Sequence, residues 1–312
     1  MDSEEIFHTF AIVIFIVLGL IKTIFSLTIV IIISSNWNRK CRSILNLHVC
    51  NSCISSLFYV FAVSTQIPLL FEITYQENHY ISLVFCEIRG FIFLTACAIK
   101  SYSYLVQTIS RYFITVHHKR VILLTFRFNL TMIFISWIAA LLVTSISFRT
   151  PFAYRYEPDS HLCVITSKIF SISFYPTIFI FLIPMIIIIW LYGSVLWHTT
   201  HSNRIHPMNI SMIRTKRHIK VFRNILINLT VLIIGAAPYF ISIIINSVTA
   251  IPQIFHLIST IFISMSNTFE LIAIFFTNEN VKTIFYIKIG WHHEPSNNIP
   301  MRRNRGQCTT II

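Results

Sequence analysis

Residues 101–120 read SYSYLVQTISRYFITVHHKR, and the interpretation of the whole chain depends on this stretch. It starts as an uncharged apolar segment and then places one arginine in the sequence Ser110-Arg111-Tyr112. A basic cluster follows at 117–120. A lone arginine at the end of an apolar helix can be a long side chain that snorkels to a membrane surface, or it can be a functional group. The rest of the sequence has to decide between the two.

The composition indicates a protein that crosses a membrane several times. Of the 312 residues, 55% are hydrophobic and 11% are charged, whereas soluble domains carry about 25% charged residues. The mean hydropathy is +0.73. The opening MDSEEIFHTF is acidic, and the apolar run behind it is too long for a cleavable secretory signal. The formal charge of +13 is attributed to basic cytoplasmic loops, so we expect no nucleic-acid partner.

Seven segments are apolar and long enough to span a bilayer, which requires about 20 residues. The spans are placed at 8–34, 44–70, 84–115, 126–148, 169–197, 220–248 and 254–276. The expected fold is therefore an all-α membrane protein, a seven-transmembrane helix bundle over 8–276. Pro184 and Pro238 lie inside two of the spans and predict kinks. Residues 277–291 predict a short amphipathic eighth helix on the bilayer surface, followed by a tail at 292–312.

The charges of the loops predict the orientation of the chain. The first, third and fifth loops and the tail are basic, whereas residues 1–7 and the second loop are acidic. Because basic loops remain in the cytoplasm, we expect an extracellular N-terminus, a cytoplasmic C-terminus and a plasma-membrane location. The fourth loop, at about 149–168, carries charges of both signs and is a mild exception.

The cysteines agree with this orientation. Cys86, at the outer end of the third span, and Cys163, in the fourth loop, both lie on the predicted outside, where an oxidising compartment favours a disulfide. Such a bond would hold the fourth loop over the mouth of the bundle. Cys308 in the tail is either an unmodified thiol or a palmitoylation site. The thiols expected to be buried within spans are Cys50, Cys53 and Cys97.

Taken in order, these features resemble a divergent rhodopsin-like (class A) G-protein-coupled receptor over about residues 8–290. Cys86 precedes Arg111 by 25 residues, the interval between the disulfide cysteine and the motif arginine in that family. The segment NLHVCN (46–51) resembles the motif Asn-Leu-x-x-x-Asp, with Asn51 in place of the acid. The other matching features are Trp137, Pro184, Tyr192, Pro238 and the turn FFTNENVKTIF (275–285).

The resemblance implies that Arg111 and Tyr112 contact a heterotrimeric G protein when the sixth span moves outward, with Tyr192 packing toward the arginine. The sequence departs from the family in the groups that restrain this movement. Ser110 replaces the acid before the arginine, and His218, at the foot of the sixth span, is not an acid either. LIIGAAP (232–238) has Ala236 at the position of the switch tryptophan, and ELIAI (270–274) replaces Asn-Pro-x-x-Tyr. We therefore expect measurable ligand-independent activation.

Charged groups within spans are costly and usually functional, and three of them are candidates for an internal pair: Lys22, Lys100 and Glu270. Lys100 is eleven residues before Arg111, which at 100° per residue places it about 20° from the same helix face. By alignment, Asn51, Lys100 and Glu270 share an internal polar pocket in which many relatives bind sodium. We expect the Lys100 ammonium to replace that ion, paired with Glu270 and hydrogen-bonded by Asn51. A Lys22–Glu270 pair is the rival, and a lipid-facing Lys22 is the third possibility.

The ligand is expected in the outer half of the bundle, between spans three, five, six and seven. The candidates by alignment are Arg89, Phe93, Leu94, Cys97, Tyr239, Phe240, Ile243, Asn246, His256, Thr260 and Ser264. Phe93 stands where amine receptors keep an aspartate, and Ser264 stands where opsins keep the retinal lysine. An extracellular ligand that is a peptide, a lipid-like molecule or an acidic odorant remains.

The function expected from the resemblance is a receptor that binds an extracellular ligand and activates a G protein. The alternative is a transporter or channel that uses Lys100 and Glu270 as part of a pathway. No inverted repeat or pair of broken helices supports that alternative. No metalloprotease motif or nucleophile elbow occurs, so we expect no catalytic residue, metal or cofactor. Besides the ligand and the G protein, membrane lipids are the expected partners.

Overall fold

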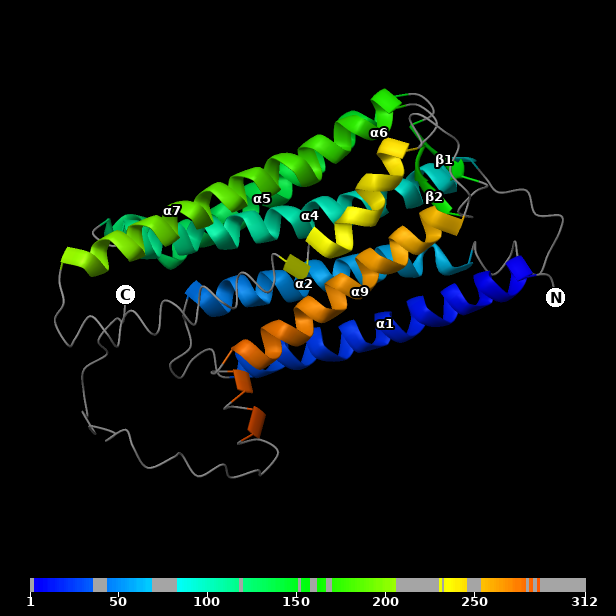
Figure 1. Cartoon of the computed structure of the whole chain (residues 1–312). Helices are drawn as coiled ribbons and strands as arrows, with labels where there is room; N and C mark the ends of the chain where they lie inside the picture. The colour runs from blue at the N-terminus through cyan, green and yellow to red at the C-terminus, as the bar shows by residue number, and fades with distance from the viewer. Residues whose placement is uncertain are drawn as a thin grey trace.

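The computed structural model describes residues 3–35, 44–68, 83–117, 120–150, 153–157, 162–166, 170–205, 230–231, 233–245, 254–278, 281–282 and 285–286. Its long helices lie side by side in one elongated bundle (Figure 1). They are α1 (Ser3–Ser35), α2 (Ile44–Ser64), α4 (Leu83–Val116), α5 (Phe126–Phe148), α7 (Ile183–Ile205) and α9 (Ile254–Thr277). A shorter apolar helix spans Ile233–Ile245.

Five helical segments in the described part are long and apolar enough to cross a membrane. They are Ile6–Ser35, Ile44–Ser64, Phe126–Phe148, Ile172–His198 and Phe255–Thr277. Large apolar side chains such as Phe134, Leu142 and Trp190 remain exposed on their outer faces, as expected where the solvent is lipid. α4 is more polar because it is the central helix, packed against α2, α5 and α7. It buries Lys100, Ser103 and other polar side chains among them.

The fifth span is interrupted close to the predicted kink. It consists of α6 (Phe170–Pro176), the π-helical segment η2 (Thr177–Leu182) and α7. Pro184 has no N–H, so the carbonyl of Ile180 one turn earlier cannot receive its usual backbone bond. The hydroxyl of Ser101 donates to that carbonyl, and the hydroxyl of Tyr102 donates to the carbonyl of Phe179 at 3.1 Å. Side chains of α4 thus satisfy the backbone that the proline and the wide turn leave open.

A β-hairpin caps the bundle, which the all-α expectation missed. β1 (Tyr154–Glu157) pairs antiparallel with β2 (Leu162–Ile165), and Tyr156 lies opposite Cys163. The predicted disulfide is confirmed, because Cys86 on α4 is bonded to Cys163 on β2. Figure 1 shows the hairpin at the end of the bundle where α1 and α9 begin, which we call the hairpin end.

The hairpin lies tightly against α4 because that helix has a glycine beneath it. A Cβ atom at Gly90 would come within 2.9 Å of Tyr154 and 3.2 Å of the Cys163 carbonyl. The Gln66 side chain accepts from the Cys163 N–H and donates to its carbonyl, both at 3.1 Å. Burial raises the pKa of Tyr156 to about 12, so its phenol is uncharged at neutral pH. The disulfide, Gly90 and Gln66 together fix the hairpin on the bundle.

The observed bounds agree closely with the predicted spans in the middle of the chain and differ at some ends. α5 and α9 match the predictions 126–148 and 254–276 to within one residue. α1 already begins at Ser3, and α7 continues to Ile205, beyond the predicted ends at 8 and 197. Most of the predicted eighth helix lies outside the described residues, although 281–282 and 285–286 are helical. That helix therefore stays a prediction, and the tail lies outside the described part.

Candidate functional site

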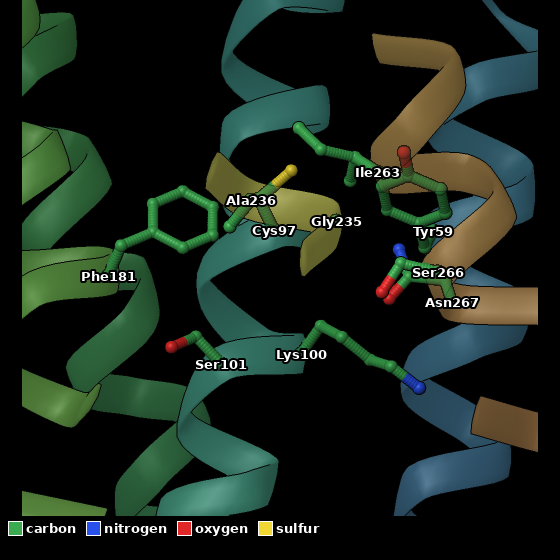
Figure 2. A pocket seen from close by; sticks show the side chains of 10 residues that line it. All are labelled: Tyr59, Cys97, Lys100, Ser101, Phe181, Gly235, Ala236, Ile263, Ser266 and Asn267. Carbon is green, nitrogen blue, oxygen red and sulfur yellow. The ribbon is translucent and has the colours of Figure 1, made fainter. Parts of the chain in front are cut away.

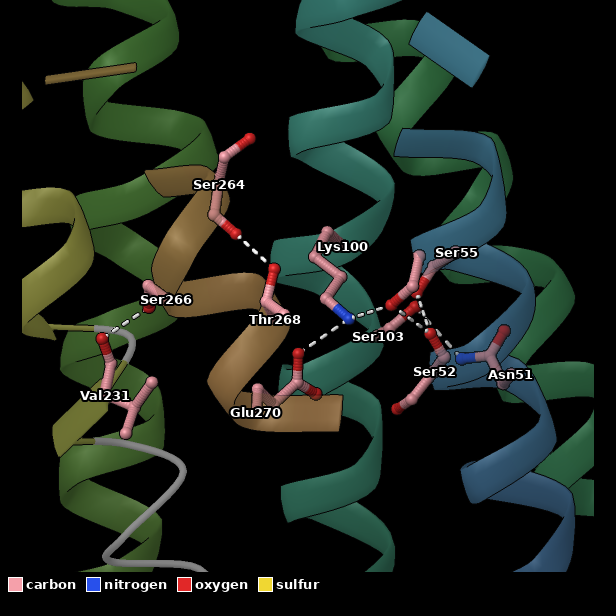
Figure 3. Close-up of polar contacts among 11 residues, drawn as sticks. Asn51, Ser52, Ser55, Lys100, Ser103, Val231, Ser264, Ser266, Thr268 and Glu270 are labelled. Atoms are coloured by element: carbon pink, nitrogen blue, oxygen red, sulfur yellow. Dashed lines mark hydrogen bonds and ion pairs between the residues drawn. The ribbon is translucent and has the colours of Figure 1, made fainter. Parts of the chain in front are cut away.

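An ion pair lies at the centre of the bundle. Lys100 Nζ on α4 is 2.7 Å from Glu270 Oε2 on α9, and the two side chains are 4% and 2% exposed. Figure 3 shows Lys100 reaching from α4 toward Glu270. The ammonium also donates to the hydroxyl of Ser56 on α2. The ammonium therefore links α2, α4 and α9. Because Lys100 neutralises Glu270, the alternative pair of Glu270 with Lys22 on α1 is not needed.

The prediction that Asn51 forms a hydrogen bond with Lys100 is wrong. Asn51 Nδ2 donates to Ser103 Oγ at 3.0 Å, and Asn51 Oδ1 accepts from Trp137 Nε1 at 3.0 Å. Asn51 thus joins α2 to α4 and α5, away from the ion pair (Figure 3). Five residues along a helix correspond to a rotation of about 140°, so Ser56 faces a different neighbour from Asn51. Ser56 is the residue of α2 that meets Lys100.

Lys22 is buried, so the alternative in which it faces lipid is excluded. Lys22 lies on α1 and is only 2% exposed. Lys22 Nζ donates to Ser264 Oγ on α9 at 3.3 Å, and it lies 4.8 Å from the centre of the Tyr59 ring. Neither the Lys22–Glu270 pair nor the snorkelling side chain is formed. Instead, a second lysine side chain lies inside the bundle.

A small cavity lies beside the ion pair, and we call it the inner cavity. Its volume of about 20 Å³ leaves room for about one water molecule. Gly235 and Ala236 lie between Phe181 on one side and Tyr59 and Asn267 on the other (Figure 2). Ala236 is the residue at the position of the expected switch tryptophan, so the space exists where a large side chain is replaced by small ones.

A larger cavity lies beneath the hairpin, and we call it the outer cavity. Its volume is about 50 Å³. Residues of α4, α9, the hairpin and the helix Ile233–Ile245 form its wall, and the wall contains no Asp, Glu, Lys or Arg among the described residues. Cys97, Phe181 and Ile263 line both cavities. The two spaces are therefore neighbours along one column that leads from the hairpin toward Lys100.

The structure places most of the aligned ligand candidates on the wall of the outer cavity. Those that line it are Phe93, Leu94, Cys97, Tyr239, Ile243, His256 and Thr260. Arg89 and Phe240 do not line it, and Asn246 lies outside the described residues. Ser264 lies deeper in the bundle, where its hydroxyl accepts a hydrogen bond from Lys22. The remaining wall residues, which sequence reasoning missed, are Gly90, Leu162, Val164, Ile165, Ser173, Phe181 and Ile263.

The hairpin part of the wall could have been found from the sequence. Leu162 and Val164 flank Cys163, and the predicted disulfide fixes that cysteine at the mouth of the bundle. Because the disulfide fixes the position of Cys163, it also fixes the residues on either side. The apolar residues Leu162 and Val164 are therefore expected at the cavity wall. Phe181 could not be found in this way, because its direction depends on the π-helical segment that contains it.

At the opposite end of the bundle, Arg111 has no acidic partner among the described residues, and its Nε is buried without a hydrogen bond. The preceding Ser110 donates instead to Asn129 Oδ1 on α5 at 2.6 Å. The same oxygen lies 3.2 Å from His48 Nε2 on α2. Tyr192 on α7 accepts a hydrogen bond from Thr108, one turn from Arg111, at 3.1 Å. The position of His218 lies outside the described residues.

A comparison with protein families matches residues 27–272 to the family described as 7 transmembrane receptor (rhodopsin family). The match covers more than half of the chain and includes both cavities and Arg111. The chain belongs to the rhodopsin family of seven-transmembrane receptors. No curated protein matches the receptor in a sequence search.

Family membership accounts for two further helices of the bundle, beyond the five long apolar helices of the described part. The receptor is a multi-pass membrane protein, and the part that the structure describes contains five strongly apolar spans. α4 and the helix Ile233–Ile245 supply the other two spans of the family's seven-helix bundle. Receptors of this family respond to ligands and act through G proteins, and the disulfide between α4 and the hairpin occurs in this receptor too.

Proposed function

We propose that the receptor binds a compact, uncharged, lipophilic molecule in the outer cavity and activates a heterotrimeric G protein at the opposite end. The observation that carries this proposal is the apolar cavity closed by the hairpin. In this arrangement, the hairpin and residues 1–7 are extracellular in the plasma membrane. The bundle extends over 8–276, and the eighth helix at 277–291 and the tail at 292–312 face the cytoplasm. The loop charges and the disulfide support that orientation.

The wall of the outer cavity favours a neutral ligand over the other classes considered. A buried charged group needs a partner of opposite charge, and the described wall offers none. Arg89, which could have held an acidic odorant or a peptide terminus, does not line the cavity. Hydrogen-bonding side chains on the wall include Ser173, Tyr239, His256 and Thr260. A ligand with one carbonyl or hydroxyl group on an apolar body matches this distribution.

The size of the cavity disfavours a peptide. About 50 Å³ of accessible space corresponds to roughly three to five water molecules. The hairpin residues Leu162 and Val164 form part of the wall and are tied to α4 by the disulfide. A peptide side chain would have to displace this cover, whereas a compact molecule requires little rearrangement.

The column of cavities gives the ligand a path for its effect. The outer and inner cavities share Cys97, Phe181 and Ile263, and the inner one is lined by Lys100. A ligand that pushes on these residues biases the relative positions of α4, α9 and the helix Ile233–Ile245. A shift of this kind changes the populations of inactive and active states when the ligand prefers one of them. Arg111 at the far end of α4 then meets the G protein.

The proposal is tested with purified receptor in lipid nanodiscs and a set of short-chain alcohols, ketones, esters and the matching carboxylic acids. Neutral members should raise the thermal stability of the receptor and change nucleotide exchange on an added G protein. Thr260→Trp fills the outer cavity and should abolish both effects. Thr131→Trp changes an exposed residue of α5 and serves as the matched control. Selective responses to the acids, or neutral responses that survive Thr260→Trp, would contradict the assigned ligand class.

A further inference from the structure

The buried charges in the bundle do not balance. Lys22, Lys100 and Glu270 are 2%, 3% and 1% exposed. Glu270 is engaged by Lys100, and no other carboxylate among the described residues pairs with Lys22. An isolated buried charge is strongly unfavourable in a protein interior and more so within a bilayer. The cluster therefore calls for one additional negative charge or for the loss of a proton from Lys22.

The contacts of Lys22 in the described part of the receptor are with neutral groups. The ammonium has three N–H donors, and in the described part of the receptor its one hydrogen bond goes to Ser264 Oγ. That oxygen also lies 3.4 Å from the Tyr59 hydroxyl, and Tyr59 lines the inner cavity together with Asn267. Lys22, Ser264, Tyr59 and Asn267 thus bring N–H and O–H groups together with no anionic acceptor among them.

Space for an additional group lies next to these donors. Tyr59, whose ring faces Lys22 at 4.8 Å, also lines the inner cavity together with Asn267 and Lys100 (Figure 2). The cavity has room for about one particle of the size of a water molecule. Lys100 lines the cavity, whereas Lys22 does not and reaches it only through the Tyr59 ring. A negative charge in the cavity would therefore be attracted by Lys100 directly and by Lys22 across that ring.

We propose that the inner cavity and the adjacent Lys22–Tyr59–Ser264 cluster form a binding site for one small monovalent anion, of the size of chloride or formate. Lys22 supplies the balancing charge, and the hydroxyl of Tyr59 and the amide of Asn267 supply neutral donors. The volume excludes anions such as sulfate or gluconate. With the anion bound, the cluster of two lysines and one glutamate has no net charge.

The site lies between the ligand and the ion pair. Along α9, Thr260 lines the outer cavity and Ser264 contacts Lys22, and Glu270 follows six residues later. Four residues of helix correspond to about 6 Å. An anion at this depth therefore stabilises the packing of α1 and α2 on α9 directly beneath the ligand. It acts on the folded receptor whether or not a ligand or a G protein is bound.

The test uses full-length receptor in neutral-lipid nanodiscs, with no ligand and no G protein. Thermal unfolding is followed while sodium gluconate is exchanged for sodium chloride or sodium formate at constant ionic strength. A ligand that binds only the folded state raises its stability with saturation, and we expect the melting temperature to rise by roughly 5 °C at saturating anion. Since the sodium concentration is constant, cation effects cancel.

Variants connect the effect to the cluster. Lys22→Met should remove the dependence on chloride and formate, and Lys282→Met, which changes a lysine near Tyr286 outside the bundle centre, should leave it intact. If Lys22→Met does not fold, Ser264→Ala and Tyr59→Phe should each shift the half-saturating anion concentration upward by about tenfold. A wild-type receptor equally stable in all three salts has a neutral Lys22, which would overturn the proposal. An equal response in Lys22→Met and wild type would overturn it too. Because no signalling is measured, a missing anion effect leaves the assigned receptor function unaffected.

Discussion

At the scale of single residues, the Lys100–Glu270 pair distinguishes this receptor from relatives that keep a cation in the bundle. The ammonium occupies the position of an ion and is covalently part of α4, so it cannot dissociate. Ser56 and Glu270 hold it from α2 and α9. A permanent internal cation should make the receptor insensitive to sodium. Ligand affinity measured in sodium and in potassium salts of the same anion should therefore agree.

The first prediction concerns the loss of one member of the pair. Lys100→Met should destabilise the receptor by about 3–5 kcal/mol, because it leaves the carboxylate of Glu270 buried without its cation. The double variant Lys100→Met with Glu270→Gln should recover much of that loss, since no uncompensated charge remains. Thermal unfolding of the two single variants and the double variant measures the coupling. If the stability losses of the two single variants simply add in the double variant, Lys100 and Glu270 do not stabilise each other.

At the scale of helices and strands, two glycines allow close approaches that larger residues would prevent. A Cβ atom at Gly235 would overlap the Ser266 side chain on α9, where the Ser266 hydroxyl donates to the Val231 carbonyl. The helix Ile233–Ile245 therefore lies so close to α9 that the Ser266 side chain alone fills the space at Gly235. Gly90 does the same for the hairpin on α4.

The second prediction follows from this close contact. Gly235→Ala should destabilise the receptor by about 1–3 kcal/mol, the usual cost of overpacking, even though alanine is the better helix former. Gly193→Ala is the matched control, because its added methyl group meets nothing within 4 Å and should stabilise α7 slightly. Melting temperatures that change in the same direction for both variants would contradict the predicted close packing.

The third prediction concerns the bond that holds the hairpin. The Cys86–Cys163 disulfide closes a loop over a sequence separation of 77, so removing it should cost about 2–5 kcal/mol. Cys86→Ser, Cys163→Ser and the double variant should be equally unstable, because each removes the same bond. Mass spectrometry should find the two cysteines linked in receptor from the cell surface. Free thiols at both positions, or additive losses in the double variant, would refute the bond.

The sequence predicted the helices better than their connections. Apolar length placed α5 and α9 almost to the residue, because a bilayer demands about 20 apolar residues wherever the chain crosses it. The hairpin was missed because short strands in a loop leave little periodicity, and a disulfide and Gly90 hold it in place. The Lys100–Glu270 pair was predictable because a buried charge needs a partner. The register of α2 was not, because it contains several polar residues at similar spacing, such as Ser52, Ser55 and Ser56.

At the scale of the whole molecule, the two ends of the bundle have opposite character. The hairpin end is covered and tied by a disulfide, whereas Arg111 at the far end has no acidic partner in the described part. Ser110, which replaces the acid, is instead engaged with Asn129 on α5. The loss of a restraint worth about 1.4 kcal/mol raises the ratio of active to inactive receptor tenfold. We therefore propose that the receptor combines a ligand cavity at the hairpin end with a weakly restrained coupling site at Arg111.

Nucleotide exchange on added heterotrimeric G proteins, measured without ligand in membranes with matched receptor levels, tests this central claim most directly. The account predicts that at least one G protein exchanges faster with wild type than with receptor-free membranes. Arg111→Ala should abolish this exchange, and Ser110→Asp should lower it by giving the arginine an acidic neighbour. Wild-type exchange no faster than in receptor-free membranes across all G-protein classes, or equal exchange in Arg111→Ala, would contradict it.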